Sequence, residues 1–314
     1  CQDSMDLQTA SSKTRAVVID KDLFAVRGRI NVKLEKGTNQ ALPTSAKGNV
    51  EMQSVPSAMA SAMKYAGAYK MERVFKPAGI YEERTIAEGL DRWYTIYFDE
   101  SKDVAEVLQQ FNKAAGVEYA ERVLPIARPK FTAKPYTGPA PQTRNQPTAS
   151  AFNDPLLAKQ WHYNDGSISP RAKKGADCNL KPVWEKYTTG KSNVIVAVVD
   201  GGIDITHEDL VDNLYINEKE KNGQAGVDDD GNGFVDDVYG YNFVEAEDVV
   251  GGTIQPDNEG HGTHVAGTVG ARNNNGIGVA GVAGGNGTPD SGVRLMSCQI
   301  FRGKDEQGDA AAAI

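Results

Sequence analysis

Residues 193–204 read NVIVAVVDGGID, and this stretch decides the fold class. The uninterrupted apolar run from Val194 to Val199 is typical of a strand buried on both faces of a parallel α/β sheet. The strand ends at Asp200, and active sites in open α/β sheets are built at the carboxyl ends of the strands. Asp200 is therefore a candidate functional residue, although an aspartate at a strand end also serves as a turn or cap residue.

A second stretch, EGHGTHVAGTVGA at residues 259–271, predicts a loop that leads into a helix. The glycines and alanines in its first turns would allow the helix to pack closely on a sheet, with His261 reaching a carboxylate at the sheet's end. The alternatives are two structural histidines or a metal site. A zinc site is disfavoured because helical zinc pairs sit four residues apart with a glutamate between them, whereas His261 and His264 enclose Gly262 and Thr263.

Length and composition restrict the function classes. The 314 residues, 39% of them hydrophobic, are enough for a sizeable core and more than one domain. The net charge of -8 and the absence of a lysine or arginine block argue against nucleic acid as a partner. No apolar run is long enough to cross a membrane. Cys1, Cys178 and Cys298 have neither the pattern of a disulfide framework nor metal-ligand spacing.

The sequence divides into four segments. Residues 1–19 are polar and predict a flexible N-terminal tether. Residues 20–127 mix strand and helix patterns and predict a small α+β domain. Residues 128–152 are rich in proline and predict an extended linker that proteases can reach, with a structured loop as the alternative. Residues 153–314 carry the two stretches above and predict a parallel-sheet α/β domain.

The α+β prediction for residues 20–127 rests on periodicity. RINVKLEKG (29–37) alternates apolar and polar residues as a half-exposed strand does, and RWYTIYFDE (92–100) and VEYAERVLPIA (117–127) are further strand candidates. Between the last two, SKDVAEVLQQFNKAAG predicts a helix that stops at Gly116. Its apolar residues fall on one face: Val104, Val107, Leu108, Phe111 and Ala115.

Cys1 is followed by the polar stretch QDSMDLQTASSKT. One interpretation is that a signal peptide has been removed and the new N-terminal cysteine carries a lipid, as in bacterial lipoproteins. This interpretation predicts an extracytoplasmic protein, either secreted or held at the cell surface or in the periplasm. The alternative is that the numbering merely begins at this cysteine.

The stretches VAVVDGGIDITHEDL (196–210) and GHGTHVAGTVGARNNNGIGVAGVA (260–283) resemble the aspartate and histidine motifs of bacterial subtilases, the subtilisin-like serine endopeptidases of the peptidase S8 family. The resemblance covers residues 153–314 and implies a partial subtilisin-like catalytic domain. Residues 20–127 are more loosely similar to the propeptide that folds and inhibits such enzymes before activation.

The resemblance implies catalytic roles for two residues. His261 would be the general base and Asp200 the carboxylate that orients it, while His264 would be structural. Gly201 departs from the family, which more often has serine or threonine after the aspartate. The family's nucleophile lies in a downstream Gly-Thr-Ser-Met-Ala motif that these 314 residues lack, and the final GDAAAAI resembles the first turns of the helix that follows the strand VRLMSCQIF (293–301). We therefore expect a subtilase truncated before the catalytic serine, inactive as it stands.

The stretch RNNNGIGV (272–279) resembles the calcium loop of thermitase-like subtilases. Calcium takes six to eight oxygen ligands, which a tight loop can supply. The resemblance implies as ligands the carbonyl oxygens of Arg272, Ile277 and Val279, the Asn275 side chain, and the carboxylates of Asp209 and Asp154. The alternative is an asparagine-rich turn.

A second calcium site is predicted in GVDDDGNGFVDDVYG (226–240). Asp228, Asp230 and Asn232 alternate, Gly233 allows a sharp turn, and Phe234 can offer its carbonyl oxygen, as in the first half of an EF-hand loop. Tyr239 stands where the closing glutamate would be. Asp236 or Asp237 would then have to complete the ligand shell. A solvated acidic turn is the alternative, although carboxylates this close repel one another unless a cation intervenes.

Together these features predict a calcium-stabilised serine endopeptidase, secreted or surface-anchored and made as a zymogen. Its expected partners are protein or peptide substrates, its own propeptide and the remaining C-terminal part of the catalytic domain. The competing hypothesis is a catalytically inactive fragment or pseudoprotease that binds other proteins. An intact aspartate and histidine pair favours the enzyme, because a binding module does not need a general base.

Overall fold

The computed structural model of the chain describes residues 19–21, 23–45, 48–125, 152–163, 175–244, 252–256, 260–302 and 306–307. The tether with Cys1 (to residue 18), the proline-rich linker (to residue 151) and the alanine-rich final segment (from residue 308) lie outside the described residues. The chain forms two compact units. One comprises Cys1–Pro77 and Glu82–Ile126, and the other Ala78–Tyr81 and Ala127–Ile314.

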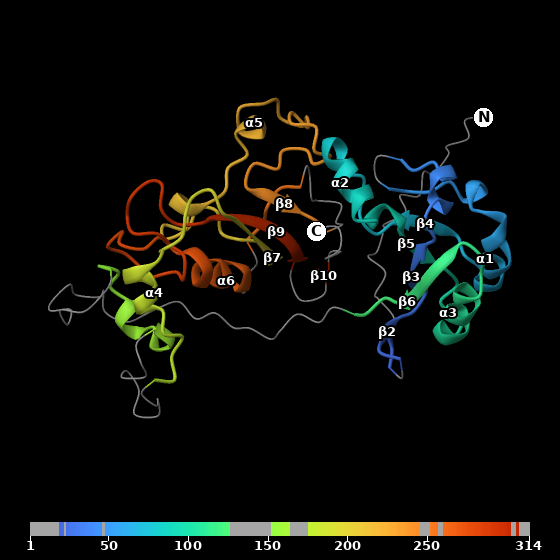
Figure 1. Cartoon of the computed structure of the whole chain (residues 1–314), viewed down its shortest axis with the longest axis horizontal. Helices are drawn as coiled ribbons and strands as arrows, with labels where there is room; N and C mark the ends of the chain where they lie inside the picture. Colours follow the sequence, from blue (N-terminus) through green and yellow to red (C-terminus); the bar gives the residue numbers. More distant parts are fainter. Residues whose placement is uncertain are drawn as a thin grey trace, which may run out of the picture. The chain divides into compact units, whose positions relative to one another are not determined.

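The first unit contains a four-stranded antiparallel sheet with the strand order β4-β5-β3-β6. Its strands are β3 (Arg29–Leu34), β4 (Lys70–Arg73), β5 (Trp93–Tyr97) and β6 (Val117–Arg122), with a short pair β1 (Ile19–Asp20) and β2 (Ala25–Val26). Its helices are α1 (Ala60–Ala66), α2 (Glu82–Ala87) and α3 (Val104–Asn112). α3 packs on β3 and β6, and α1 packs on α3 (Figure 1).

The residues of the first unit explain its elements. In β3 the predicted alternation is confirmed, because Ile30, Val32 and Leu34 are fully buried while the residues between them are not. The helix α3 begins after Asp103, whose carboxylate accepts the Glu106 N–H at 2.9 Å as an N-cap. Burial of one face of α3 against the sheet then stabilises the α+β unit.

The second unit is built on a sheet whose central strand is β9 (Arg294–Arg302). β7 (Ile195–Gly201) and β8 (Gly240–Asn242) pair with β9 in parallel, and β10 (Glu306–Gln307) pairs with it antiparallel. The helices are α4 (Lys181–Lys186), α5 (Glu218–Lys221) and α6 (His261–Gly270). Helices together with a parallel sheet confirm the predicted α/β class.

The core of the second unit lies between α6 and the sheet (Figure 1). Its buried apolar residues are Val198, Ile203, Leu210, Leu214, Ala266, Ala271, Val293 and Leu295. Small residues on α6 allow the helix to approach β7 and β9 closely, as the sequence indicated.

The prediction that the Val194–Val199 run is buried on both faces was wrong. Val198 is 4% exposed, but Ile195 and Val199 on the other face of β7 are 50% and 40% exposed. Among the described residues, β9 is the strand paired with β7 and α6 is the helix packed on it, so alternate side chains remain uncovered. Within the same residues, no helix is long and apolar enough to cross a membrane.

Candidate active site and cation-binding loops

Asp200 lies at the carboxyl end of β7, where the pairing with β9 becomes irregular. Asp200 pairs with Gln299, but the next residue, Gly201, pairs with Phe301, so Ile300 is an extra residue on β9. Such a bulge bends the strand and redirects the side chain beside it. The Asp200 side chain is 16% exposed, so it is largely withdrawn from water at the edge of the sheet.

His261 is the first residue of α6 and meets Asp200 there. Its Nδ1 lies 2.7 Å from Asp200 Oδ1, and its side chain is 19% exposed. The next residue must be glycine, because a Cβ on Gly262 would lie 2.1 Å from the carbonyl oxygen of Gly201. This close approach of helix and strand brings together the two residues that the sequence motifs singled out, whereas His264 on the same helix is exposed.

The contact with Asp200 determines which ring nitrogen of His261 carries the proton. An ionised carboxylate can only accept, so Nδ1 carries the proton in the Asp200–His261 contact and Nε2 is the nitrogen with the lone pair. Asp200 Oδ1 also accepts the Gly201 N–H at 2.6 Å. Gly201 has no side-chain hydroxyl that could donate to the carboxylate, but its backbone N–H does donate to it and helps to hold it in place. The pair can act as an oriented general base.

The asparagine-rich loop after α6 lies against the two carboxylates proposed to complete its site. Asp154 accepts the N–H groups of Asn274 (2.9 Å) and Asn275 (3.3 Å). Asp209 accepts the Asn275 side-chain amide and the Val279 N–H, each at 2.8 Å. The structure thus gathers Asp154, Asp209 and Asn275, with Arg272, Ile277 and Val279 on the same loop. The Arg272 N–H donates to the Asp209 carbonyl oxygen, and the Ile277 N–H to the Asn275 side chain.

Electrostatics of this loop favour a cation. Asp154 and Asp209 are 0% and 2% exposed, and no lysine or arginine among the described residues forms an ion pair with either. Burial raises the pKa of Asp154 to about 6, with the charge of Asp209 adding to the rise, and burial also raises the pKa of Asp209. Two buried carboxylates and amide oxygens are hard donors of the kind that calcium takes, so the residues fit such an ion.

The acidic loop is organised by its own N–H groups. Asp228 accepts from the backbone of Gly231, Asn232 and Gly233 at 2.7, 3.1 and 2.8 Å. Asp230 accepts the Asn232 N–H at 2.9 Å, and the Asn232 side-chain oxygen accepts the Phe234 N–H at 2.8 Å. The four predicted residues from Asp228 to Phe234 therefore belong to one tightly turned loop.

The two residues offered to close the shell behave differently. The side-chain amides of Asn217 and Asn232 donate to both Asp230 and Asp237, so Asp237 belongs to the cluster. Burial raises the pKa of Asp237 to about 6, and the charges of Asp230 and Glu220 add to the rise. Asp236 instead accepts the Gly226 N–H at 2.8 Å, on the other side of the loop.

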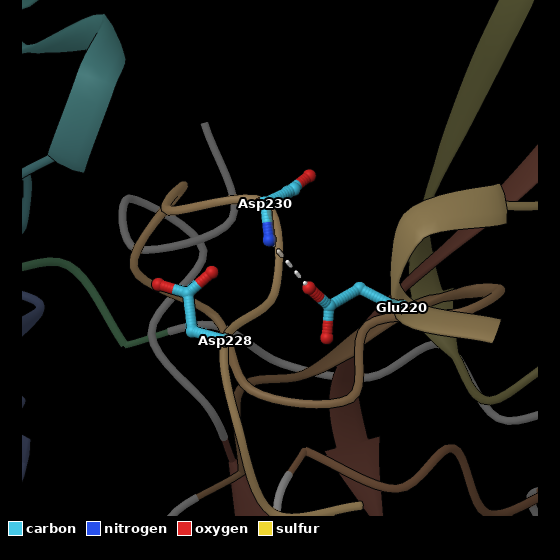
Figure 2. Close-up of side chains that lie close together, drawn as sticks. All are labelled: Glu220, Asp228 and Asp230. Carbon is cyan, nitrogen blue, oxygen red and sulfur yellow. Dashed lines mark hydrogen bonds between the residues drawn. The ribbon is translucent and has the colours of Figure 1, made fainter. Parts of the chain in front are cut away.

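Glu220 is the residue of this cluster that the sequence did not indicate. It lies on α5, is 5% exposed, and accepts the N–H groups of Asp229, Asp230 and Asp236 at 2.7, 3.0 and 3.0 Å. Carboxylate oxygens of Glu220, Asp228 and Asp230 lie within 4.8 Å of one another (Figure 2). A buried glutamate of α5 therefore joins the acidic loop, and the carboxylates of Glu220, Asp228 and Asp230 together fit a hard cation.

Comparisons with known proteins find matches to the part of the chain that carries Asp200 and His261. Residues 191–287, which include Asp200 and His261, match the Peptidase_S8 model, described as the subtilase family. Subtilisin-like protease 1 of Plasmodium falciparum (isolate 3D7) is 52% identical over 51% of this chain and 20% of its own length. The protein of that name from Plasmodium berghei is 38% identical over 52% of this chain and 23% of its own.

Two further similar proteins are also named as proteases. The extracellular basic protease of Dichelobacter nodosus is 36% identical over 43% of this chain and 21% of its own length. Among solved structures, a protease from Pseudoalteromonas arctica PAMC 21717 matches at 33% identity over 48% of this chain and 40% of that chain, with a TM-score of 0.28. The chain spans about a quarter or less of the curated relatives named here.

Proposed function

We propose that the protein is a serine endopeptidase of the subtilisin type, stabilised by calcium and made as a zymogen. The observation that carries this proposal is the 2.7 Å contact between Asp200 and His261 at the end of a parallel sheet, within the segment that matches the subtilase family. A protein-binding module has no use for an oriented imidazole, so the enzyme is the better reading of that contact.

In the proposed reaction His261 removes the proton of a serine hydroxyl as the oxygen attacks a peptide carbonyl carbon. The serine is supplied by sequence beyond these 314 residues, which contain no Gly-Thr-Ser motif. Nε2 of His261 takes the proton and later returns it to the leaving amine, so the imidazole ends as it began. Asp200 accepts from Nδ1 throughout and stabilises the transient imidazolium.

The first unit is proposed to be the propeptide, which assists folding of the catalytic domain and inhibits it. Its α+β arrangement, upstream of the segment that matches the subtilase family, supports this role. The proposed substrates are proteins or peptides. We place the enzyme outside the cytoplasm, secreted or attached to the cell surface, because its relatives include a protease named as extracellular.

Calcium is proposed at two places, the loop of residues 272–279 with Asp154 and Asp209, and the acidic loop with Glu220. Buried carboxylates without cationic partners among the described residues support the first site. Clustered carboxylate oxygens support the second. At both places the ion would neutralise buried negative charge and hold the loop closed, and neither ion would take part in peptide hydrolysis.

The test of the catalytic proposal uses the protein with its downstream coding sequence and a fluorogenic protein substrate. His261→Ala should reduce kcat by at least about 10⁴-fold, because the general base is lost. His264→Ala is the matched control, since it removes an exposed imidazole from the next turn of the same helix, and it should leave hydrolysis unchanged. Full activity in His261→Ala would refute the proposed base. A full-length protein without any activity that still binds peptides would favour the binding module.

A further inference from the structure

Three polar side chains lie in one row across the ends of the parallel strands. Asp200 of β7 is directly opposite Gln299 of β9, and Gln299 is directly opposite Asn242 of β8. In a parallel sheet, residues in register point to the same face. Gln299 and Asn242 are 0% and 3% exposed, although asparagine and glutamine side chains usually lie at the surface.

Both amides hold the segment that leads toward the candidate catalytic histidine. Asn242 donates its N–H to the Gly252 carbonyl oxygen at 2.9 Å and its side-chain amide to the Thr253 carbonyl oxygen at 3.1 Å. Gln299 accepts the Gln255 N–H at 2.9 Å through Oε1. Residues 252–256, here called the crossing segment, are thus hydrogen-bonded first to β8 and then to β9.

The crossing segment reaches β7 next. Pro256 forms a parallel bridge with Gly202, two residues beyond Asp200. The approach leaves no room for a side chain, because a Cβ on Gly202 would lie 1.9 Å from the Gln255 carbonyl oxygen and 2.8 Å from Gln299 Oε1. Five residues after Pro256 the chain arrives at His261.

We propose that Gln299 and Asn242 are positioning residues for the Asp200–His261 pair, acting through the crossing segment. The remaining polar atoms of the two amides are used on the strands themselves, since Gln299 Nε2 donates to the Phe301 carbonyl oxygen (3.0 Å) and Asn242 Oδ1 accepts the Val244 N–H (3.0 Å). A buried amide is costly when any polar atom lacks a partner, so the full set of hydrogen bonds is satisfied at one placement of the segment.

The same bonds fix the bulge beside Asp200. Gln299 is the partner of Asp200 in register, and its side chain reaches over Ile300, the extra residue, to Phe301. One side chain therefore holds both the strand end that directs Asp200 and the segment that delivers His261. The effect of this side chain on catalysis rests on the proposed function. Its effect on the Asp200–His261 geometry does not, and it can be tested on these 314 residues.

The test follows the His261 Nδ1 proton by ¹H NMR of the chain, as a low-field signal that His261→Ala removes. Gln299→Met keeps the length of the side chain and removes its hydrogen bonds, and Asn242→Leu does the same on β8. Gln255→Pro removes the N–H that Gln299 accepts, together with the side chain of a partly exposed residue, and it leaves Gln299 and Asn242 in place if a core variant does not fold. The control is Gln160→Met. Like Gln299, Gln160 bonds the backbone through its side-chain amide, which makes two hydrogen bonds of 2.8 Å with Ala280.

We expect each of the three variants to lose the signal or to exchange the proton at least tenfold faster, while the control keeps it. An unchanged signal in the folded variants would overturn the proposal, and so would loss of the signal in the control, which would mean general loosening. In the full-length enzyme the same variants should lower kcat more than tenfold at an unchanged KM. If no form of the protein hydrolyses peptides, the proposed function fails, yet the proton signal still decides the positioning role.

Discussion

Replacing Asp209 with alanine should destabilise the second unit and remove the part of its calcium response that comes from the 272–279 loop. The carboxylate is 2% exposed and accepts two hydrogen bonds, from Asn275 Nδ2 and the Val279 N–H. A buried donor left without an acceptor costs about 1–3 kcal/mol, so the loss of both acceptors in Asp209→Ala should cost about 2–6 kcal/mol even without the ion. An ion present at a hundred times its dissociation constant adds about 3 kcal/mol to the wild type.

Thermal unfolding of the chain, measured with calcium and with a chelator, separates the two contributions. Each kcal/mol moves the midpoint by about 2–4 °C in a unit of this size, so the ion at the 272–279 loop should account for about 6–12 °C of the shift that chelation causes in the wild type. In Asp209→Ala this part of the shift should be lost, while the part due to the acidic loop remains. Asp204→Ala is the control, because the Asp204 carboxylate accepts two hydrogen bonds from Thr206, a donor outside the 272–279 loop. Equal calcium shifts in wild type and Asp209→Ala would refute the site.

Three further predictions concern other parts of the chain. Glu220→Gln should weaken calcium binding to the acidic loop at least tenfold by titration calorimetry, because a charged acceptor of three N–H groups becomes neutral. Burial raises the pKa of Tyr94 to about 12, so the unfolded chain loses this proton first as pH rises from 10 to 12, and stability falls by about 3 kcal/mol over that window. Tyr94→Phe should remove that fall in denaturant titrations of the first unit, and an equally steep fall would contradict it. Gly262→Ala should reduce full-length activity about a hundredfold by pushing α6 off the Gly201 carbonyl, whereas Gly267→Ala, with open space around its Cβ, should be tolerated.

The meeting of Asp200 and His261 could be predicted because local residues mark both ends of the contact. An apolar run that stops at an aspartate defines a strand end, and a Gly-His-Gly entry defines a helix start that can approach it. The same holds for β3 and α3, where periodicity alone gave the buried face. Patterns of this kind depend on neighbours along the chain, which a sequence displays directly.

Glu220, Gln299 and the open face of β7 could not be predicted, because each depends on contacts between distant segments. Glu220 stands in EKEK, where every neighbour is charged and nothing distinguishes the buried glutamate from the exposed ones. Gln299 stands between Cys298 and Ile300 in β9, and nothing in the sequence showed that its amide would accept the distant Gln255 N–H. The exposure of Ile195 and Val199 depends on which elements pack against each face of β7, and an apolar run does not show which elements those are.

Carboxylates in both loops are already held by N–H donors, and this decides what calcium would do there. Asp228 accepts three backbone N–H groups, Asp154 accepts two, and Glu220 accepts three. Each carboxylate has about four lone-pair sites, so these bonds fix the direction of the oxygens and leave capacity for a cation. Loops organised in this way reach their shape through the chain's own donors, and the ion relieves the repulsion between charges that the shape brings together. Calcium at these loops would therefore act on stability more than on the fold, and we expect chelation to lower the unfolding midpoint while the folded signal at low temperature persists.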